Sequence, residues 1–337
     1  MMLEALLSVP SERRRLVAAA AAELGDPAPD MLVSAGTEAV VLTSMLAGEL
    51  RLPMAYLRPK PKTHGRQQRV EGELRGRIAL IAAEQDADAI RDYTDLVAEN
   101  GAQVSRVVPL PSQWERLGEG TPLGSASRLT ATPSPGLERN KEVARVLLDI
   151  GAVIIRQEPF RYASGLLSPI YTDCRLLISH PDEWQSVLEG LSAKLEGATF
   201  DAIDGVATSG IPHASVLAYR WGKPLAFVDD GAIAGAPAKG SRLAIVEDLV
   251  TTGKSVLEAT DVLRAEGMNV DQCFAIFTYD RSQPSLEAAG IACDPLSDLA
   301  NLLEVGVEAG YFGVAERDAV LDWRRDPQGW TARHEPI

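Results

Sequence analysis

The stretch LAIVEDLVTTGKS joins an apolar run to two adjacent carboxylates and a turn rich in hydroxyl groups. The apolar run predicts a buried strand ending at Glu247 and Asp248, and the turn from Thr251 to Ser255 predicts the start of a helix. Backbone N–H groups at a helix start, with nearby hydroxyls, bind phosphate. The carboxylates would repel phosphate, so we expect them to meet sugar hydroxyls or a magnesium ion. The alternative is an ordinary N-capped helix after a solvated acidic pair.

A second stretch, AYLRPKPKTHGRQQRVEG at residues 55 to 72, is strongly basic. From Arg58 to Arg77 the chain carries seven Lys/Arg and one His against Glu71 and Glu73, although its net charge is -14. So acidic a chain argues against general binding to nucleic acid or membrane surfaces. We therefore expect the loop to hold a small anion, with a solvated basic loop as the alternative.

The composition places the chain among soluble globular proteins. Its 337 residues suffice for two domains with separate cores. Cys174, Cys273 and Cys293 are odd in number and lack C-x-x-C spacing, which favours a reducing cytoplasm. The segment SERRRLVAAAAAELG predicts an amphipathic helix with Ser11 as N-cap and Gly25 as its stop, without the apolar core of a signal peptide. No run reaches the roughly 18 apolar residues that a membrane span needs.

Residues 111 to 137 are crowded with Pro, Gly, Ser and Thr and predict an interdomain linker. On its N-terminal side, RIALIAA and VSRVVPL flank a helix at about residues 86 to 100. On its C-terminal side, RLAIVED and CFAIFTY flank a helix at about residues 254 to 266. This alternation predicts parallel α/β domains at residues 1 to 110 and 138 to 337.

The two domains share a sequence pattern. DMLVSAGTEAVVLTSMLAGELRLPMAYL, from Asp30, parallels DGVATSGIPHASVLAYRWGKPLAFV, from Asp204, and RIALI parallels RLAIV. Both copies run from an aspartate through a strand, a glycine turn and a helix to an aromatic residue and a further strand. This order indicates an internal duplication. The alternative is that any two α/β domains share apolar strands and glycine-ended helices.

The aligned copies have lost different parts. Ala82 and Ala83 of the first copy correspond to the acidic pair of the second. In the second copy the counterpart of the basic loop, VDDGAIAGAPAKG, keeps only Lys239 as a cation. The first domain therefore keeps the basic loop, and the second domain keeps the acidic pair.

LAIVEDLVTTGKS resembles the motif that binds phosphoribosyl pyrophosphate (PRPP) in type I phosphoribosyltransferases, and VATSGIP is similar to their pyrophosphate loop. The resemblance implies two Rossmann-like domains with central, mostly parallel sheets. It also implies that the acidic pair contacts the ribose hydroxyls and that the turn holds the 5′-phosphate. The PRPP-binding residues implied in these segments are Glu247, Asp248, Thr251, Thr252, Gly253, Lys254, Ser255, Thr208, Ser209 and Gly210.

FRYASGLLSPIYTDCR, residues 160 to 175, resembles the hood signature of the orotate phosphoribosyltransferases within that family. Read as a pattern alone, it predicts a β-hairpin with a Ser-Gly turn. The resemblance implies that Ser164, Gly165 and Tyr171 bind orotate. YDRSQPSLEAAGI is similar to the stretch whose arginine binds the orotate carboxylate, which implies that role for Arg281; the alternative is a surface salt bridge.

The basic loop is similar to the catalytic loop of these enzymes, Y-x-R-K-x-x-K-x-H-G. Its matching residues are Tyr56, Arg58, Lys62, His64 and Gly65. Pro59 replaces a lysine of the pattern, which puts one pyrophosphate contact in doubt, and Lys60 is the candidate substitute. The resemblance implies that the loop residues Arg58, Lys60, Lys62 and His64 bind PRPP. It also implies that Arg58, Lys62 and His64 take part in catalysis with Asp248.

In this family the enzyme is a dimer, and the loop of one subunit closes over the active site of the other. Combined with the complementary losses, the resemblance implies a fused pseudo-dimer with one active site, made by the second domain and the loop of the first. The implied reaction converts orotate and PRPP to orotidine 5′-monophosphate and pyrophosphate in pyrimidine biosynthesis. Mg²⁺ would be held mainly by PRPP, with Glu247 and Asp248 nearby. We expect either a monomer acting as the pseudo-dimer or a homodimer of such chains. The alternatives are transfer to another base and a non-catalytic PRPP-binding regulator.

Overall fold

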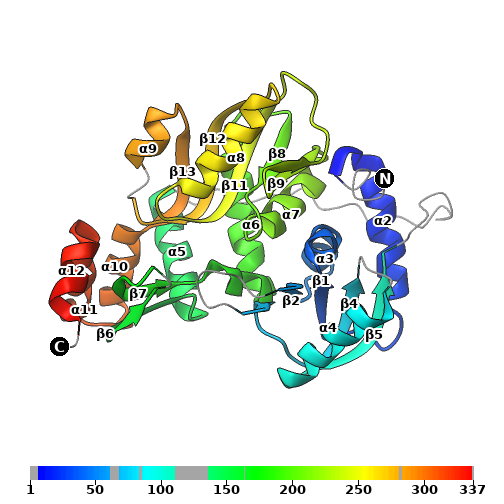
Figure 1. The fold of residues 1–337 in the computed structure, drawn as a ribbon, viewed down its shortest axis with the longest axis horizontal. Helices are drawn as coiled ribbons and strands as arrows, with labels where there is room; N and C mark the ends of the chain where they lie inside the picture. The colour runs from blue at the N-terminus through cyan, green and yellow to red at the C-terminus, as the bar shows by residue number, and fades with distance from the viewer. Residues whose placement is uncertain are drawn as a thin grey trace.

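The computed structural model describes residues 7–60, 68–82, 86–110, 136–162, 164–280 and 283–335. It contains two α/β units, each built on a mostly parallel sheet (Figure 1), which confirms the predicted fold class. The first sheet has the order β3-β2-β1-β4-β5, with β3 antiparallel to β2. Its strands are β1 (Met31–Ala35), β2 (Met54–Leu57), β3 (Val70–Glu71), β4 (Arg77–Ala82) and β5 (Gln103–Pro109). Helix α3 (Thr37–Leu50) covers one face and α4 (Ala87–Glu99) the other.

The second sheet has the order β10-β9-β8-β11-β12-β13, with β10 antiparallel to β9. Its strands are β8 (Ala202–Gly205), β9 (Leu225–Asp229), β10 (Ala232–Ala234), β11 (Arg242–Val250), β12 (Asn269–Thr278) and β13 (Ala292–Asp298). Helices α6 (Pro181–Glu196) and α7 (Ile211–Trp221) cover one face, and α8 (Lys254–Ala265) covers the other.

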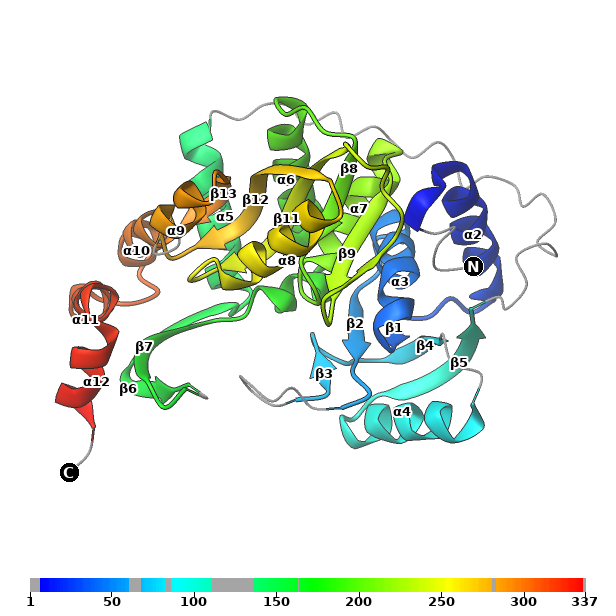
Figure 2. The same cartoon turned by 45° about the horizontal axis from the view of Figure 1, so that its top comes forward.

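A separate hairpin of β6 (Val153–Arg161) and β7 (Leu167–Thr172) extends from the second unit (Figure 2). It confirms the hairpin that the sequence pattern predicted. Helices α11 (Val314–Arg325) and α12 (Pro327–His334) pack beside it. The Trp323 indole of α11 donates a hydrogen bond to the Leu167 carbonyl at 3.0 Å. The remaining elements of this unit are α5 (Gly136–Asp149), η2 (Cys174–Ser179), α9 (Gln283–Ala288) and α10 (Leu299–Glu308).

The first five strands of the two sheets follow the same order, and the register between the central strands repeats. Asp30 accepts a hydrogen bond from the backbone N–H of Arg77 at 2.8 Å, and Asp201 accepts one from Arg242 at 2.9 Å. Each of the two strand pairs β4/β5 and β11/β12 also has a register shift after its second residue. The counterpart of Asp30 is therefore Asp201, and the sequence alignment that began at Asp204 was wrong by three residues. The correspondence of Ala82 with Glu247 is unaffected, because it follows from β4 and β11.

The two units pack directly against each other through α3 and α7, which lie side by side in both views (Figures 1 and 2). The helices approach so closely that a Cβ added to Gly48 would lie 2.9 Å from the Val216 side chain. One apolar core runs through both units without a break and includes Val40, Met54 and Leu188. An interface with a shared core resembles that of an obligate dimer.

Helix α2 (Pro10–Glu23) bridges the units from the N-terminal side. Its N-cap residue is Val9, so the prediction of Ser11 as N-cap was wrong. Proline is favoured in the first turn because it has no N–H to satisfy, and Pro10 therefore starts the helix one residue before Ser11. Gly25 follows the helix end with φ of +71°, as a glycine stop requires.

The predicted boundaries hold for α4 and α8 but not for the start of the second unit. Helix α4 begins after its N-cap Asp86, and α8 begins at Lys254, as expected. Residues 111–135 of the predicted linker lie outside the described residues, and α5 already begins at Gly136. The described part of the chain has no helix with the length and apolar character that a membrane crossing requires. The three cysteines are free, and a cytoplasmic location stays a prediction.

One strand position differs sharply between the units. Asp204 of β8 occupies the place that Val33 holds in β1. It is fully buried, and among the described residues neither carboxylate oxygen has a hydrogen-bond partner. Burial raises the pKa of Asp204 to about 8. At neutral pH the folded protein therefore holds this carboxyl in its protonated form.

We expect Asp204→Asn to stabilise the protein increasingly as the pH rises from about 4 to about 8. Below its ordinary pKa the aspartate is protonated in both the folded and unfolded states, so burial costs little. Above that pH the unfolded state loses the proton and the folded state keeps it, which lowers the free energy of unfolding by about 1.4 kcal/mol per pH unit. Urea denaturation between pH 4.5 and 8 measures the difference. Asp261→Asn, on the exposed face of α8, is the control; parallel curves for Asp204→Asn and wild type would contradict the expectation.

Candidate active site

The acidic pair lies at the carboxyl edge of the second sheet. Strand β11 pairs with β8 only as far as Val246, so Glu247 and Asp248 extend past the end of β8. The strand itself continues to Val250, beyond the end that the sequence predicted. Both side chains are largely buried, and burial raises the pKa of Asp248. Ligands of open α/β sheets bind at this edge, so the pair is placed to meet one.

The turn after the pair presents hydroxyl groups to solvent. Gly253 has φ of +76°, a left-handed conformation that glycine adopts without a Cβ penalty. Thr251, Thr252 and Ser255 are exposed, and Lys254 makes an exposed contact of 3.6 Å with Glu258 on the next turn of α8. The start of α8 therefore offers hydroxyls and a helix N-terminus together, which is the arrangement expected of a phosphate cradle.

The predicted pyrophosphate loop packs onto β11 beside the acidic pair. Its Gly210 N–H donates to the Val206 carbonyl at 2.8 Å, and the Val206 N–H donates to the Val246 carbonyl at 3.1 Å. A Cβ on Gly210 would lie 2.4 Å from the Val246 carbonyl oxygen. Only glycine fits here, and the loop thereby lies next to the residue that precedes Glu247.

Arg58 reaches this loop from the first unit. Its Nη1 donates a hydrogen bond of 3.1 Å to the Thr208 hydroxyl. Its backbone N–H donates to the Arg69 carbonyl at 2.8 Å, and Arg69 Nε donates to the Arg58 carbonyl at 3.0 Å. These bonds join the two ends of the basic loop beside the second unit. Lys60 is exposed.

Lys62 and His64 lie outside the described residues, so their predicted roles stay predictions. Tyr56 is buried next to Arg58, whose Nη2 donates to the Tyr56 hydroxyl at 3.1 Å. Burial, with the nearby charge of Glu71, raises the pKa of Tyr56. Its phenol therefore stays neutral.

The described residues at the corresponding edge of the first sheet lack these groups. Ala82, the counterpart of Glu247, is the last residue of β4 and is fully buried. Ala39 stands where the second unit has Gly210, and Thr37, the counterpart of Thr208, is already the first residue of α3. Helix α3 includes the residues that correspond to the loop of the second unit, so in the described residues of this edge Glu247 is replaced by alanine and the loop conformation is absent. Ala83 lies outside the described residues.

The hood hairpin connects to the segment that precedes Arg281. The Thr172 and Tyr279 hydroxyls are hydrogen-bonded at 2.7 Å. Tyr171 packs against Phe160, with ring centroids 5.5 Å apart. Arg281 itself lies outside the described residues.

Ser164 and Gly165 form the exposed turn of this hairpin, where Gly165 has φ of +84°. The described contacts do not bring these two residues to the PRPP-binding segments. Their predicted contact with orotate stays a prediction.

Sequence reasoning assigned no role to Glu71, Asp173 or Arg175. The structure places Glu71 between Arg58 and Arg175, largely buried at the interface of the units. The available signal was the position of Glu71 as one of only two acids in a basic run. Its partner Arg175 could not be identified, because it lies far away in the sequence.

The donor set fits a magnesium ion that arrives with its phosphate ligand. Within the described ranges, no group of three or more His, Cys, Asp or Glu side chains could hold a metal ion. Glu247 and Asp248 provide carboxylates at the site. Mg²⁺ commonly binds through one or two carboxylates together with substrate phosphates, so these two residues suit such a bound ion.

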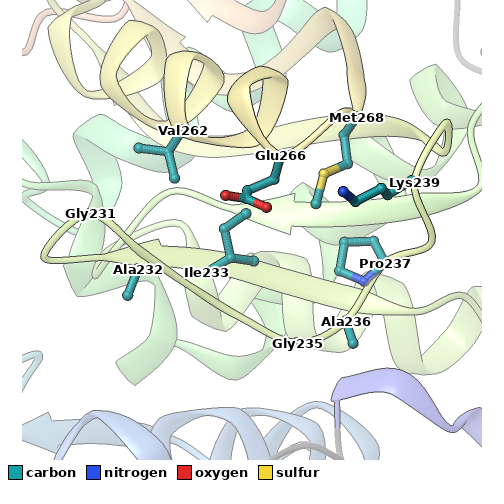
Figure 3. A pocket seen from close by; sticks show the side chains of 10 residues that line it. All are labelled: Gly231, Ala232, Ile233, Gly235, Ala236, Pro237, Lys239, Val262, Glu266 and Met268. Carbon is teal, nitrogen blue, oxygen red and sulfur yellow. The ribbon is translucent and has the colours of Figure 1, made fainter.

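A cavity lies between β10 and the C-terminal half of α8 (Figure 3). The Lys239 and Glu266 side chains line it, together with Ile233 and Met268. None of its lining residues belongs to the phosphate cradle at the opposite end of α8. Lys239, the cation kept by the second copy, therefore lines a cavity separate from the phosphate cradle.

Comparison with known proteins assigns the chain to a family. No protein-family model matches it. It is 41% identical over 202 residues to an orotate phosphoribosyltransferase of Coxiella burnetii, which covers 56% of this chain and 97% of that relative. The chain belongs to the orotate phosphoribosyltransferase family. An orotate phosphoribosyltransferase of Bacillus cereus is 38% identical over 200 residues, covering 95% of its length.

Two solved structures are similar to the chain. The orotate phosphoribosyltransferase of Aeropyrum pernix is 32% identical, covers 50% of this chain and 99% of its own, and gives a TM-score of 0.45. The UMP synthase of Leishmania donovani is 17% identical, with a TM-score of 0.50 over 95% of this chain and 80% of its own. The latter likeness concerns the fold alone and extends over both units.

Proposed function

We propose that this chain is a catalytic orotate phosphoribosyltransferase with one active site, formed between its two units. It converts orotate and PRPP to orotidine 5′-monophosphate and pyrophosphate in pyrimidine biosynthesis. The observation that carries the proposal is the hydrogen bond from Arg58, at the base of the basic loop, to Thr208 in the second unit. The contact supports a loop of the first unit serving a site in the second. The membership of the family supports the reaction.

In this proposal the second unit holds the sugar phosphate. The turn from Thr251 to Ser255 binds the 5′-phosphate at the start of α8, and Glu247 and Asp248 accept hydrogen bonds from the ribose hydroxyls. The loop from Thr208 to Gly210 receives the pyrophosphate. These groups come from adjacent segments of one sheet edge, so they orient PRPP before reaction.

The reaction breaks the bond between C1 of the ribose and pyrophosphate, and forms the bond between C1 and N1 of orotate, whose N1 proton is taken up by the released pyrophosphate or by solvent. Negative charge grows on the pyrophosphate oxygens as the bond breaks. Arg58, Lys62 and His64 neutralise this charge from the loop, which is the kind of electrostatic stabilisation that lowers barriers most. Mg²⁺, when bound with PRPP near Glu247 and Asp248, would supply Lewis-acid chemistry to the departure of pyrophosphate. The closed loop excludes water that would otherwise hydrolyse the sugar.

The hood orients the acceptor base. Arg281 pairs with the orotate carboxylate, and Tyr171 with the turn at Ser164 and Gly165 covers the ring. The Thr172–Tyr279 hydrogen bond ties the hood strand to the segment carrying Arg281. Hood and arginine therefore act as one orotate-binding unit in this proposal.

We further propose that the two units arose by duplication and act as an internal pseudo-dimer. The repeated strand order and register, and the packing of α3 on its counterpart α7, support this origin. The first unit, residues 1 to 110, then keeps the loop, and the second, which includes α5 from Gly136 on, keeps the substrate pocket. A single chain contains both parts, so a monomer is sufficient for activity.

The test mixes the purified chain with orotate, PRPP and Mg²⁺ and follows the loss of orotate absorbance. We expect turnover that depends on all three components. Adenine, hypoxanthine and uracil, tested in place of orotate, check transfer to other bases. Binding of PRPP with no loss of orotate at high protein concentration would instead indicate a regulator and would contradict the proposal.

A further inference from the structure

A buried ion network crosses the interface of the two units and ends at the predicted pyrophosphate loop. Arg58 Nε donates to Glu71 Oε1 at 2.7 Å. The other Glu71 oxygen pairs with Arg175 of the second unit, and Arg175 also pairs with Asp173, with Nε and Oδ1 2.5 Å apart. The Glu71 side chain is only 5% exposed. Two cations and two anions thus balance each other in a largely buried space.

The network joins two segments that the reaction must hold together. At one end Arg58 donates to Thr208. At the other end Asp173 and Arg175 directly follow β7, the second strand of the hood hairpin. Glu71 is the only member that contacts both arginines, so it links the loop base to the end of the hood strand.

The neighbouring contacts fix the strand that carries Glu71. The Glu73 N–H donates to the Ser179 hydroxyl at 2.8 Å, and that hydroxyl donates to the Met54 carbonyl at 2.9 Å. Arg75 donates to the Ser179 carbonyl at 2.7 Å. These bonds hold β3 against η2 whether or not residue 71 is charged, so the ion pairs are not needed to join the two segments.

The second unit provides an internal comparison. Glu71 lies opposite Tyr56, and Ala234 lies opposite Phe227, in hairpins of the same design. Asp229 stands where the first unit has Arg58. A hairpin of this kind therefore forms without the ion network. Among the described residues, the network is found at the β2–β3 hairpin and no ion pair is found within β9 or β10.

We propose that Glu71 is a positioning residue, which holds the guanidinium of Arg58 against Thr208 and couples it through Arg175 to the hood. This inference rests on the proposed function. With glutamine in its place, the two arginines face each other with one anion fewer, and the single amide oxygen cannot accept from both of them as the two Glu71 oxygens do. Arg58 then samples other rotamers, and less of the protein has the loop base in the geometry that receives pyrophosphate.

The test compares Glu71→Gln with wild type in steady-state kinetics. The amide keeps the size of the side chain but loses the charge. We expect kcat/KM for PRPP to fall by roughly 10-fold to 100-fold, while KM for orotate changes by less than about 2-fold. Glu73→Gln is the matched control, because it makes the same change of charge two residues away on an exposed side chain, and it should behave as wild type. Thermal melting of each variant checks that the fold is retained.

A second measurement separates positioning from general weakening. In an Arg58→Ala background, Glu71→Gln should lower kcat/KM for PRPP no further, because residues that act through one another have non-additive effects. Additive losses would overturn the inference, as would a Glu71→Gln variant with the kinetics of wild type. An inactive wild-type chain would instead contradict the proposed function, so the two failures are distinguishable.

Discussion

Lys62→Ala and Glu247→Ala will each lower kcat by at least about 100-fold, and mixing the two purified variants will not restore activity. Removing one group that stabilises transition-state charge commonly costs on the order of 100-fold to 1,000-fold in rate. Lys62 belongs to the loop whose base, Arg58, contacts Thr208 of the same chain. If each chain builds its own site, a mixture holds only chains with a defective loop or a defective pocket. Steady-state assays of each variant and of their equimolar mixture measure the result.

Substantial recovery in the mixture would contradict this prediction, because it would mean that the loop of one chain serves the pocket of another. Binding of PRPP to Lys62→Ala, measured by calorimetry, checks that the loop variant keeps its pocket. Lys60→Ala is the matched loop variant. A comparable loss of activity in Lys60→Ala would indicate that Lys60 replaces the lysine missing at Pro59.

The single-site arrangement is consistent with the way the units pack. The apolar core that passes through α3 and α7 is continuous, so separating the units would expose a large apolar surface to water. Arg13 of α2 adds a polar connection, because it is fully buried and donates to the Lys223 carbonyl at 2.9 Å and to the Leu7 carbonyl at 2.6 Å. We therefore expect the loop base and the pocket to remain associated during turnover.

Much of this fold could be predicted because it is encoded locally. The alternation of apolar runs with helical segments predicted the two α/β units, and α4 begins where the sequence placed it, directly after Asp86, whose side chain caps the helix. The glycine turn at Gly253 and the helix start at Lys254 follow the same local rules. Each of these features depends on residues within a few positions of one another.

Register and burial could not be predicted in this way. The segment FDAIDG contains aspartates at both 201 and 204, and either can be aligned with Asp30 by letters alone. Hydrogen bonds between strands decide the choice, and these join residues distant in the sequence. For the same reason the sequence could not identify Arg175 as the partner of Glu71, or show that Asp204 is buried. Long-range contacts, and not local propensity, set these parts of the site.

We expect Gly210→Ala to lower kcat/KM for PRPP by on the order of 100-fold and to destabilise the fold by roughly 1 to 3 kcal/mol, the usual cost of overpacking. The backbone of Gly210 has φ of -75°, which alanine adopts readily, so only space decides the effect. The added Cβ would meet the Val246 oxygen at 2.4 Å and the Val206 backbone at 2.8 Å. Backbone atoms cannot rotate away as a side chain does. The loop must therefore move off β11, and Thr208 moves away from the acidic pair with it.

Gly197→Ala is the control for this substitution. Gly197 has φ of -83°, and a Cβ there would lie 3.7 Å from its nearest neighbour, the Lys194 carbonyl oxygen, which is ordinary contact. Kinetics in PRPP and the midpoint of urea denaturation measure both effects for each variant. A Gly210→Ala enzyme with activity within a few-fold of wild type would contradict the expectation. Such a result would show that residues 208–210 can adopt the helical conformation that Ala39 has in the first unit. It would also show that the close packing of Gly210 on β11 is not required for binding PRPP.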